Sequence, residues 1–269
     1  DREAMKITAL MENTGDRPGI LTEHGLSIYV ETDRHKILFD SGQSDAFVKN
    51  AETLGIRLDD IDTAVLSHGH FDHSGGLKGF LEVNQKAEIY MQRGAFIPHY
   101  NPLGKYIGVD LSLQENSRIH YVDDSLEIDE ELKLETYHDR SVFLPVQTYG
   151  MTEEHDGVRT ADRFLHEQYL IVKEGSQKVL LSGCSHRGIY NIIQWAADEQ
   201  VQTVIGGFHF MKLEPGDFCQ MDSTAEKLLE YPVKYYTCHC TGLLQYQYLK
   251  EKMGDALQYL ESGQTIVIS

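Results

Sequence analysis

The segment HGHFDHSGG at residues 68–76 carries four side chains of the kinds that bind metal ions, namely His68, His70, Asp72 and His73. His68 and His70 are two residues apart, so in an extended segment both imidazoles leave the backbone on the same side. His73 breaks this alternation, as expected where a strand turns into a helix. Imidazoles together with a carboxylate suit zinc, iron or manganese, whereas calcium requires more oxygen ligands. The spacing therefore predicts a site for one divalent ion, or for two that divide these side chains between them.

The motif HGHFDH resembles the signature of the metallo-β-lactamase superfamily, hydrolases with one or two metal ions at the edge of a sandwich. Three later segments, GCSH (183–186), GGFH (206–209) and CHCTG (238–242), resemble one branch of it. That branch contains the archaeal methanopterin-pathway enzyme that makes ribofuranosylaminobenzene phosphate from a dihydropteroate-type substrate, together with many bacterial hydrolases. The resemblance extends over nearly the whole chain from Met5. It implies an α/β fold, the four-layer αββα sandwich, with residues 1–269 as a single domain.

The resemblance also implies roles for residues outside the first motif. In the superfamily an aspartate in the place of Asp40 supports the metal loop, which makes Asp40 a candidate for orienting a ligand histidine. Asp40 is equally suited to the N-terminus of the helix expected at 44–54. Cys184 occupies the place where most members have an aspartate that bridges two metals, and its alternative is a buried small hydrophobe. His186 comes two residues after Cys184, so in an extended strand its side chain leaves the backbone on the same side. It could supply a third nitrogen ligand or cap the helix expected at 188–199.

His239 is the expected closing ligand of the site. In an extended CHC segment the side chains of Cys238 and Cys240 point away from that of His239, and a structural zinc clip requires about four clustered ligands. His209 follows two glycines at the end of a buried strand. In related folds a histidine there assists the leaving group without binding metal. The metal ligands we expect are His68, His70 and His186 around one ion and Asp72, His73 and His239 around the other, with Cys184 between or beside them. The catalytic residues we expect are Asp72, which would orient the nucleophile or transfer its proton, and His209.

Two segments depart from the pattern of the branch. YGMTEE (149–154) stands where members often have Gly-Glu-Ile-Pro, and HEQ (166–168) stands where they often have an Asp-rich segment. Most superfamily members also place a third histidine in a nearby loop with proline and glycine around it, and this chain lacks that pattern. We therefore expect His138, His155 and His166 to be surface or loop histidines. Because these departures lie where a substrate would bind, they weaken the transfer of the archaeal enzyme's substrate to this chain.

The rest of the chain is expected to supply the strands and helices that position these residues. The run at 63–67 is almost entirely apolar, which is typical of a central strand, and it delivers His68 at its carboxyl end. The stretch at 93–122 is expected to form a wall of the substrate pocket, or else a solvated linker with an aromatic core. Its His99 and Lys105 could contact an anionic ligand. Further strands are expected at 5–11, 26–31, 36–39, 87–91, 169–172, 178–181, 201–205, 234–237 and 265–268, with a meander over 118–146. Further helices are expected at 76–82, 222–231, 243–252 and 254–261.

The composition sets limits on partners and location. With 42 acidic against 24 basic residues, the formal charge of −18 repels polyanions, so we expect no nucleic acid as a partner. No apolar run approaches the roughly 20 residues that span a bilayer, and no leader pattern precedes the first strand, so neither a membrane nor secretion is indicated. Four cysteines fit a reducing cytoplasm better than a disulfide framework. Residues 1–4 are expected to be vector-derived, and the oligomeric state stays open.

These observations predict a metal-dependent hydrolase with two divalent ions, zinc in the first place and iron or manganese otherwise. A metal lowers the pKa of its bound water from about 15.7 toward 7, which provides a hydroxide nucleophile at neutral pH. The expected partner is a small-molecule substrate, and the branch that the chain resembles favours a metabolite that contains phosphate or a pterin. Two alternatives stay open: a di-iron redox protein of the same fold, and a metal-dependent binding protein without turnover.

Overall fold

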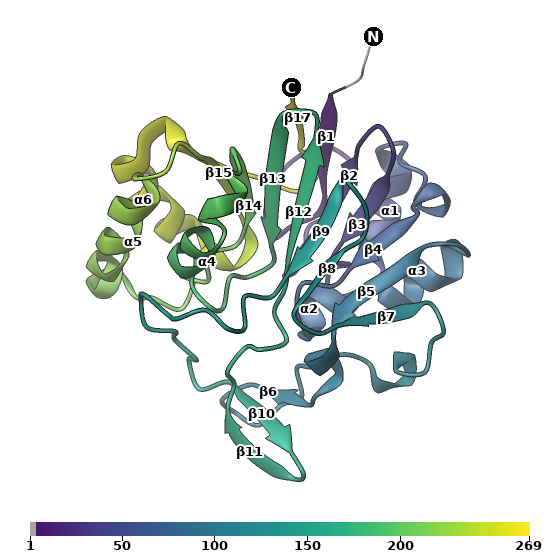
Figure 1. The fold of residues 1–269 in the computed structure, drawn as a ribbon, viewed down its shortest axis with the longest axis horizontal. Helices are drawn as coiled ribbons and strands as arrows, with labels where there is room; N and C mark the ends of the chain where they lie inside the picture. Colours follow the sequence, from purple (N-terminus) through teal and green to yellow (C-terminus); the bar gives the residue numbers. More distant parts are fainter. Residues whose placement is uncertain (1–3) are drawn as a thin grey trace.

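Two seven-stranded sheets form the centre of the computed structural model, which describes residues 4–269 (Figure 1). The first sheet has the strand order β17 (Thr265–Ile268), β1 (Met5–Met11), β2 (Ser27–Glu31), β3 (Lys36–Phe39), β4 (Thr63–Val65), β5 (Glu88–Gln92) and β7 (Ile119–Val122). The second sheet has the strand order β16 (Leu257–Tyr259), β15 (Lys234–Thr237), β14 (Thr203–Gly206), β13 (Gln177–Ser182), β12 (Tyr169–Glu174), β9 (Leu132–Glu135) and β8 (Ser125–Glu127). A small third sheet projects from the sandwich and has the strand order β11 (Val158–Ala161), β10 (Thr152–His155) and β6 (His99–Tyr100) (Figure 1).

Helices cover the outer face of each large sheet, which gives the four-layer αββα sandwich that the sequence predicts (Figure 1). The helices on the first sheet are α1 (Ala46–Thr53) and α3 (Leu77–Val83). The helices on the second sheet are α4 (Ile189–Trp195), α5 (Asp222–Leu228) and α6 (Leu243–Met253). Both sheets combine antiparallel hairpins with parallel strands, and the parallel pairs include β3–β4, β4–β5, β13–β14 and β14–β15. The carboxyl ends of β13 and β15 share one edge of the second sheet, and β4 belongs to the first sheet, which packs against it. Residues that follow the three strands can meet where the edges of the two sheets face each other.

Three clusters of buried side chains correspond to the three interfaces between layers. Between the sheets, Ile7 and Ile28 of the first sheet belong to the same cluster as Leu170 and Leu181 of the second. This two-sided burial explains the uninterrupted apolar stretches YLIV in β12 and VLL in β13.

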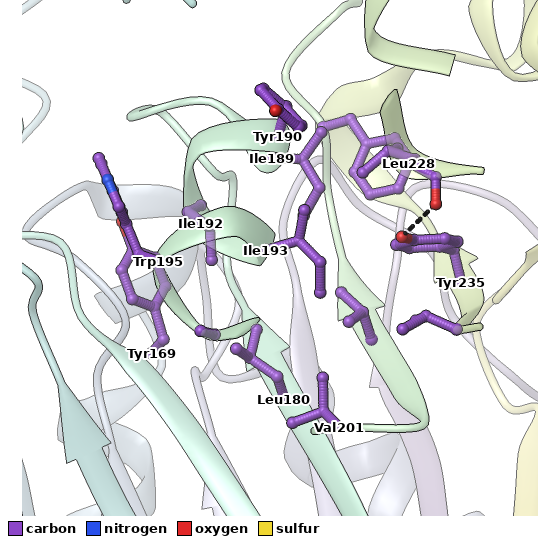
Figure 2. Packing of buried hydrophobic residues seen from close by; sticks show 14 of the residues in the cluster. Tyr169, Leu180, Ile189, Tyr190, Ile192, Ile193, Trp195, Val201, Leu228 and Tyr235 are labelled. Atoms are coloured by element: carbon purple, nitrogen blue, oxygen red, sulfur yellow. Dashed lines mark hydrogen bonds between the residues drawn. The ribbon is translucent and has the colours of Figure 1, made fainter. Parts of the chain in front are cut away.

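On the outer face of the second sheet, Ile192 and Ile193 of α4 lie toward Leu180 of β13 (Figure 2). The Tyr235 hydroxyl donates a hydrogen bond of 2.8 Å to the Leu228 carbonyl oxygen (Figure 2). A buried tyrosine hydroxyl needs such a partner, and this contact joins β15 to the end of α5.

Two predicted elements are wrong. Residues 254–261 are not a helix, because Leu257–Tyr259 forms the edge strand β16, which pairs in parallel with β15. Pairing with a neighbouring strand overrides local propensity, and the local sequence does not reveal it. The stretch 118–146 is not one meander: β7 joins the first sheet beside β5, β8 and β9 join the second, and residues 141–146 contain no strand.

Residues 1–3 lie outside the described part of the chain. The vector-derived segment at 1–4 and the single domain over 1–269 therefore stay predictions. Across residues 4–269, no helix has both the length and the apolar character needed to cross a membrane.

Candidate metal centre

The predicted metal motif follows the carboxyl end of β4 and turns into the short helix α2 (Phe71–Ser74). Its four predicted ligands are all buried, with His68 and His73 completely so. The turn requires glycine, because a Cβ atom on Gly75 would lie 2.0 Å from the Gln43 carbonyl oxygen. The close backbone approach fixes where the motif sits against the first sheet.

One group of ligand atoms unites residues from distant parts of the chain, namely Asp72, His73, Cys184 and His239. These atoms all lie within 4.8 Å of one another, and all four side chains are buried. Nε2 of His73 lies 3.0 Å from Cys184 Sγ and 3.2 Å from Nε2 of His239. Nε2 of His239 lies 3.0 Å from Oδ2 of Asp72. Ligand atoms around one tetrahedral zinc are separated by about 3.3–3.7 Å, so this group has the dimensions of a single-ion site.

His68, Cys184 and His186 form a second group of ligand atoms within 4.8 Å of one another, so Cys184 belongs to both groups. Nε2 of His68 and both ring nitrogens of His186 are buried without a hydrogen-bond partner in the described part of the chain. Leaving a buried polar atom unpaired costs free energy, so these nitrogens point to a ligand such as a metal ion. The ring centre of His70 lies 4.7 Å from that of His68 and 4.9 Å from that of His186. The rings of the three histidines expected around the first ion thus lie close together, but the ligand atom of His70 groups with those of His99 and His166 and not with those of His68 and His186.

Asp40 supports two of these histidines. Its Oδ2 atom accepts hydrogen bonds of 2.6 Å from His73 Nδ1 and from the Ser67 hydroxyl, and its Oδ1 atom accepts one of 2.7 Å from the Ser67 N–H. The Ser67 hydroxyl oxygen lies 2.7 Å from Nδ1 of His68. These contacts occupy Nδ1 of both rings and leave Nε2 free to bind a metal. The residue before α1 is Asp45, so Asp40 has the orienting role and not that of a helix cap.

His239 is held by two residues that the sequence did not indicate. Oε2 of Glu12 accepts hydrogen bonds of 2.6 Å from the His239 N–H and from the Tyr259 hydroxyl. Oδ1 of Asn13 lies 2.6 Å from His239 Nδ1. Because this amide oxygen can only accept, the His239 proton lies on Nδ1 and the lone pair of Nε2 faces Asp72. Burial lowers the pKa of His239 to about 4, against the opposing effect of the nearby Asp72 carboxylate, so the ring is neutral, as metal binding requires.

His166 lies in the loop between β11 and β12, as expected, but it is not a surface histidine, since its side chain is only 2% exposed. Nδ1 of His166 accepts a hydrogen bond of 2.8 Å from the Gly69 N–H, and Nδ1 of His99 lies 3.0 Å from the Gly69 carbonyl oxygen. Oδ2 of Asp162 lies 3.2 Å from Nε2 of His166 and 3.5 Å from Nε2 of His70. His166 is buried because its segment packs directly behind the metal motif, a contact across 97 positions that no local pattern reveals.

Three further histidines, His138, His155 and His24, differ in their surroundings. His155 is exposed and His138 is partly buried with Nε2 2.7 Å from the Leu165 carbonyl oxygen, in line with loop or surface positions. His24, which no motif singles out, has a side chain that is 43% exposed, and its Nε2 lies 3.1 Å from Oδ2 of Asp72. The sequence offers no signal for His24, because its role depends entirely on a contact with a distant residue.

Burial and neighbouring charges set the ionisation of the centre. Burial, together with the nearby His73 ring, holds the pKa of His68 well below its usual range. Burial raises the pKa of Asp72, but the nearby rings of His73, His239 and His24 together outweigh it, so the pKa lies well below the usual range. Burial, with Cys240 beside it, raises the pKa of the Cys184 thiol well above its usual range. Binding of a cation would therefore have to release the proton of this thiol.

A cavity of about 430 Å³ opens in front of the two groups. Asn101, Pro102 and Ile107 of the 93–122 stretch line it, beside residues of the centre. Lys105 does not line it, and His99 is completely buried, so neither is placed to meet an anionic ligand in this cavity.

His209 lies at the wall of this cavity, at the end of the GGFH segment. Its backbone is left-handed, with φ of 54°, and its ring centre lies 4.2 Å from that of His186 and 5.4 Å from that of Tyr149. The glycine before Phe208 is needed, because a Cβ atom on Gly207 would lie 2.3 Å from Cys240 Sγ. Burial, with His70 and His239 nearby, lowers the pKa of His209 to about 3, so its ring is neutral at neutral pH.

The sequence profile of the metallo-beta-lactamase superfamily matches residues 22–187, more than half of the chain. The chain belongs to the metallo-β-lactamase superfamily. Members of this superfamily bind divalent metal ions, and the two groups of histidine, aspartate and cysteine ligands lie in the part of the fold where the motif places them.

Three known proteins resemble the chain over most of its length. A solved structure of Tm1679, described as a metal-dependent hydrolase of the beta-lactamase superfamily, has 30% identity and a TM-score of 0.84, and covers 98% of this chain and 99% of its own. An uncharacterized protein of Methanocaldococcus jannaschii is 27% identical over 248 residues, which is 88% of this chain and 90% of that protein. The 7,8-dihydropterin-6-methyl-4-(β-D-ribofuranosyl)-aminobenzene-5′-phosphate synthase of the same organism is 27% identical, over 97% of this chain and 96% of the synthase.

Proposed function

We propose that this chain is a metal-dependent hydrolase that acts on a small metabolite with the help of two divalent ions. The observation that carries the proposal is that two groups of buried ligand atoms, each the size of one ion site, share Cys184 beside a cavity. The proposed ligands are His68, His186 and Cys184 for one ion and Asp72, His73, His239 and Cys184 for the other. We add His70 to the first ion because its ring lies beside those of His68 and His186. We favour zinc because imidazole and thiolate ligands suit it, with iron and manganese as alternatives.

The bound cations would lower the pKa of a water ligand and polarise the oxygen under attack. The residues of the chain position the reactants. Asp72 is an ionised carboxylate at the cavity wall, 3.1 Å from His24 and 3.0 Å from His239, and can orient the nucleophilic water by accepting a hydrogen bond from it. His209 is a neutral ring at the same wall, so we assign it a hydrogen bond to the departing group and not the delivery of a full proton.

We propose a metabolite that contains phosphate or a pterin as the substrate class. Lys212 is the only lysine or arginine among the described residues that line the cavity, and its ammonium group suits one anionic group. Phe71, Ile107 and Met151 offer apolar surface to a ring or a chain. The name of the 27% identical synthase includes a dihydropterin and a ribofuranosyl 5′-phosphate, which supports the same class.

We further propose that the protein works in the cytoplasm with a small molecule as its partner. Its four cysteines are free, which suits a reducing compartment. A formal charge of −18 disfavours nucleic acid. A di-iron redox role has less support, because such sites are usually rich in carboxylates and Asp72 is the only one in the two groups that share Cys184.

The test is metal content and hydrolysis measured on the same preparations. We expect elemental analysis of undialysed protein to give about two equivalents of zinc, and we expect turnover of at least one substrate from a panel of phosphodiesters, lactones and pterins. His70→Ala should lose metal and turnover together, whereas His209→Ala should keep its metal and turn over about 10²-fold more slowly. Protein without any bound transition metal would contradict the proposed centre, and metal-loaded protein that hydrolyses nothing would favour a binding protein.

A further inference from the structure

A second cavity, of about 170 Å³, lies beside the cavity that faces the metal centre. Both cavities are lined by Tyr149, His186 and His209, so these three side chains form a partition between them. The partition is held in place, because the His186 ring stacks on Phe164 with ring centres 4.4 Å apart and 9° between the planes. The two cavities therefore share one wall, and a molecule bound over the metal centre would reach the smaller cavity by passing over these three side chains.

The two cavities differ in charge. The larger one has Asp72 and Lys212 in its wall, beside the proposed cations. The smaller one has no aspartate, glutamate, lysine or arginine among the described residues that line it. Its apolar surface comes mainly from Leu144, Pro145, Ile189, Phe208, Phe210 and Leu213. A charged group would lose its hydration there without gaining a partner of opposite charge, so the smaller cavity suits an uncharged group.

The volume limits what the smaller cavity can hold. A cavity of about 150 Å³ lined by leucine, isoleucine and phenylalanine takes up one benzene molecule. At about 170 Å³, this cavity matches one six-membered aromatic ring with little room for more. Aromatic side chains in the wall, such as Phe208 and Phe210, favour edge or offset contacts with such a ring.

Polar groups at the mouth of this cavity are available to a substituent on the ring. The side chains of Gln220 and Ser223 line the cavity and make no hydrogen bond within the described chain. Asn191, by contrast, is fully used: its Oδ1 accepts from the Phe143 and Leu144 N–H groups, and it therefore holds the wall in place. A hydroxyl or amino group on the ring can form hydrogen bonds with Gln220 and Ser223.

We propose that the smaller cavity is a binding subsite for one uncharged aromatic ring, and that the substrate carries an anionic group, such as a phosphate, over the metal centre and an aryl group in this subsite. The proposal rests on the proposed function for the position of the anionic group. The subsite itself depends only on the volume, charge and position of the cavity.

The test compares the binding of methylphosphonate, phenylphosphonate and benzylphosphonate, which share one anionic group and differ in the ring and its tether. We expect isothermal titration of zinc-loaded protein to show at least about tenfold tighter binding of one of the two aryl phosphonates than of methylphosphonate. A carboxyl group on the ring, as in 4-carboxybenzylphosphonate, should abolish this preference, because the subsite offers no cation.

Two variants block the subsite from exposed positions outside the metal centre. Ser223→Trp and Gln220→Trp should abolish the preference for the aryl phosphonates and leave the affinity for methylphosphonate unchanged. Ser117→Trp, at an exposed position that lines neither cavity, is the control and should preserve the preference. The subsite would be overturned if all three phosphonates bound equally or not at all. It would also be overturned if the two tryptophan variants kept the preference for the aryl phosphonates. Protein that prefers the aryl phosphonates but hydrolyses no substrate would overturn the hydrolase and leave the subsite standing.

Discussion

Nδ1 of His166 accepts a hydrogen bond of 2.8 Å from the N–H of Gly69, the residue between the expected ligands His68 and His70. On the other side of the ring, Oδ2 of Asp162 lies 3.2 Å from Nε2. Burial raises the pKa of Asp162, but His166 and His70 outweigh it and hold the pKa well below its usual range. An ionised carboxylate can only accept, so the His166 proton lies on Nε2 and the Nδ1 lone pair faces Gly69. Asp162 thereby sets the tautomer of His166, and this tautomer holds the backbone of the metal motif in place at Gly69.

Asp162→Asn should weaken metal binding by about 10- to 100-fold without unfolding the protein. The asparagine amide can donate to Nε2 of His166, which would move the ring proton to Nδ1. Nδ1–H and the Gly69 N–H would then be two donors facing each other, and their hydrogen bond would be lost. The measurement is competition for the bound ion with a chelator of known affinity, with circular dichroism as a check of the fold. Asp139→Asn, at a side chain that is 88% exposed, should retain the wild-type metal affinity. Unchanged affinity in Asp162→Asn would show that the motif keeps its position without this carboxylate.

Gly69→Ala should destabilise the protein by about 1–3 kcal/mol and lower its metal affinity. A Cβ atom on Gly69 would lie 2.2 Å from the Ala95 carbonyl oxygen, so the backbone between His68 and His70 would have to shift. Urea unfolding measures the change in stability. Gly216→Ala is the matched control, because a Cβ atom there meets nothing within 4 Å, and its effect should stay within about 0.5 kcal/mol. Equal stability of the two variants would show that the loop yields to the added methyl group.

The role of a residue could be predicted from the sequence where that role depends on neighbours in the chain or on the end of a strand. Four ligand-type residues lie within one short motif, and the buried strands before His68, Cys184 and His239 indicate that all three emerge at strand ends. The strands before Cys184 and His239 share an edge of the second sheet, and the strand before His68 belongs to the first, so their meeting could be predicted from the way the αββα fold packs the two sheets together.

Roles that depend on distant contacts could not be predicted. Glu12 accepts from the backbone of His239 across 227 positions, and His166 contacts Gly69 across 97. Each looks like an ordinary polar residue in its own segment, and no capping or metal pattern surrounds it. The same limit applies to β16, whose pairing with β15 is visible only in the folded sheet.

Cys184→Ala should lower the occupancy of both ion sites, whereas His186→Ala should lower that of one, because only Cys184 belongs to both groups. After dialysis, elemental analysis should give about two equivalents of metal for the wild type, about one for His186→Ala and less than one for Cys184→Ala. Cys219→Ala, at an exposed free cysteine, should match the wild type. Full retention of both ions by Cys184→Ala would remove the thiol from the ligand set.

Removal of the metal should lower the melting temperature reversibly. An ion present at 100 times its dissociation constant stabilises the folded state by about 2.7 kcal/mol, which corresponds to roughly 5–10 °C in a protein of this size. The buried unpaired nitrogens of His68 and His186 add to the loss, because they have no partner once the ion leaves. Calorimetry with a chelator, and again after zinc is restored, measures the shift. A melting temperature that the chelator does not change would contradict a metal bound at these residues.

His35 should stabilise the protein most in mildly acidic solution. Its Nδ1 atom lies 2.6 Å from Oδ1 of Asp62 and its Nε2 atom lies 2.5 Å from Oδ2 of Asp129, so the ring links the first sheet to the turn between β8 and β9. Burial lowers the pKa of His35, but the hydrogen bonds with both carboxylates outweigh it and raise the pKa above its usual value. Burial raises the pKa of Asp129, but His35 together with hydrogen bonds from the Glu131 and Leu132 N–H groups outweighs it, so the pKa is lowered.

A raised histidine pKa stabilises the folded state fully below the unfolded value of about 6.5, and this contribution is lost as the pH rises through the folded pKa. The lowered pKa of Asp129 stabilises above about 3.9 and its contribution is lost as the pH falls further. The difference in free energy of unfolding between the wild type and His35→Gln should therefore be largest between about pH 4 and 6.5 and shrink toward pH 9, as measured by urea unfolding. His120→Gln, at a side chain that is 48% exposed, should give a small difference at every pH, because an exposed ion pair contributes little. A His35→Gln difference that does not change with pH would show that the ring carries no extra proton in the folded state.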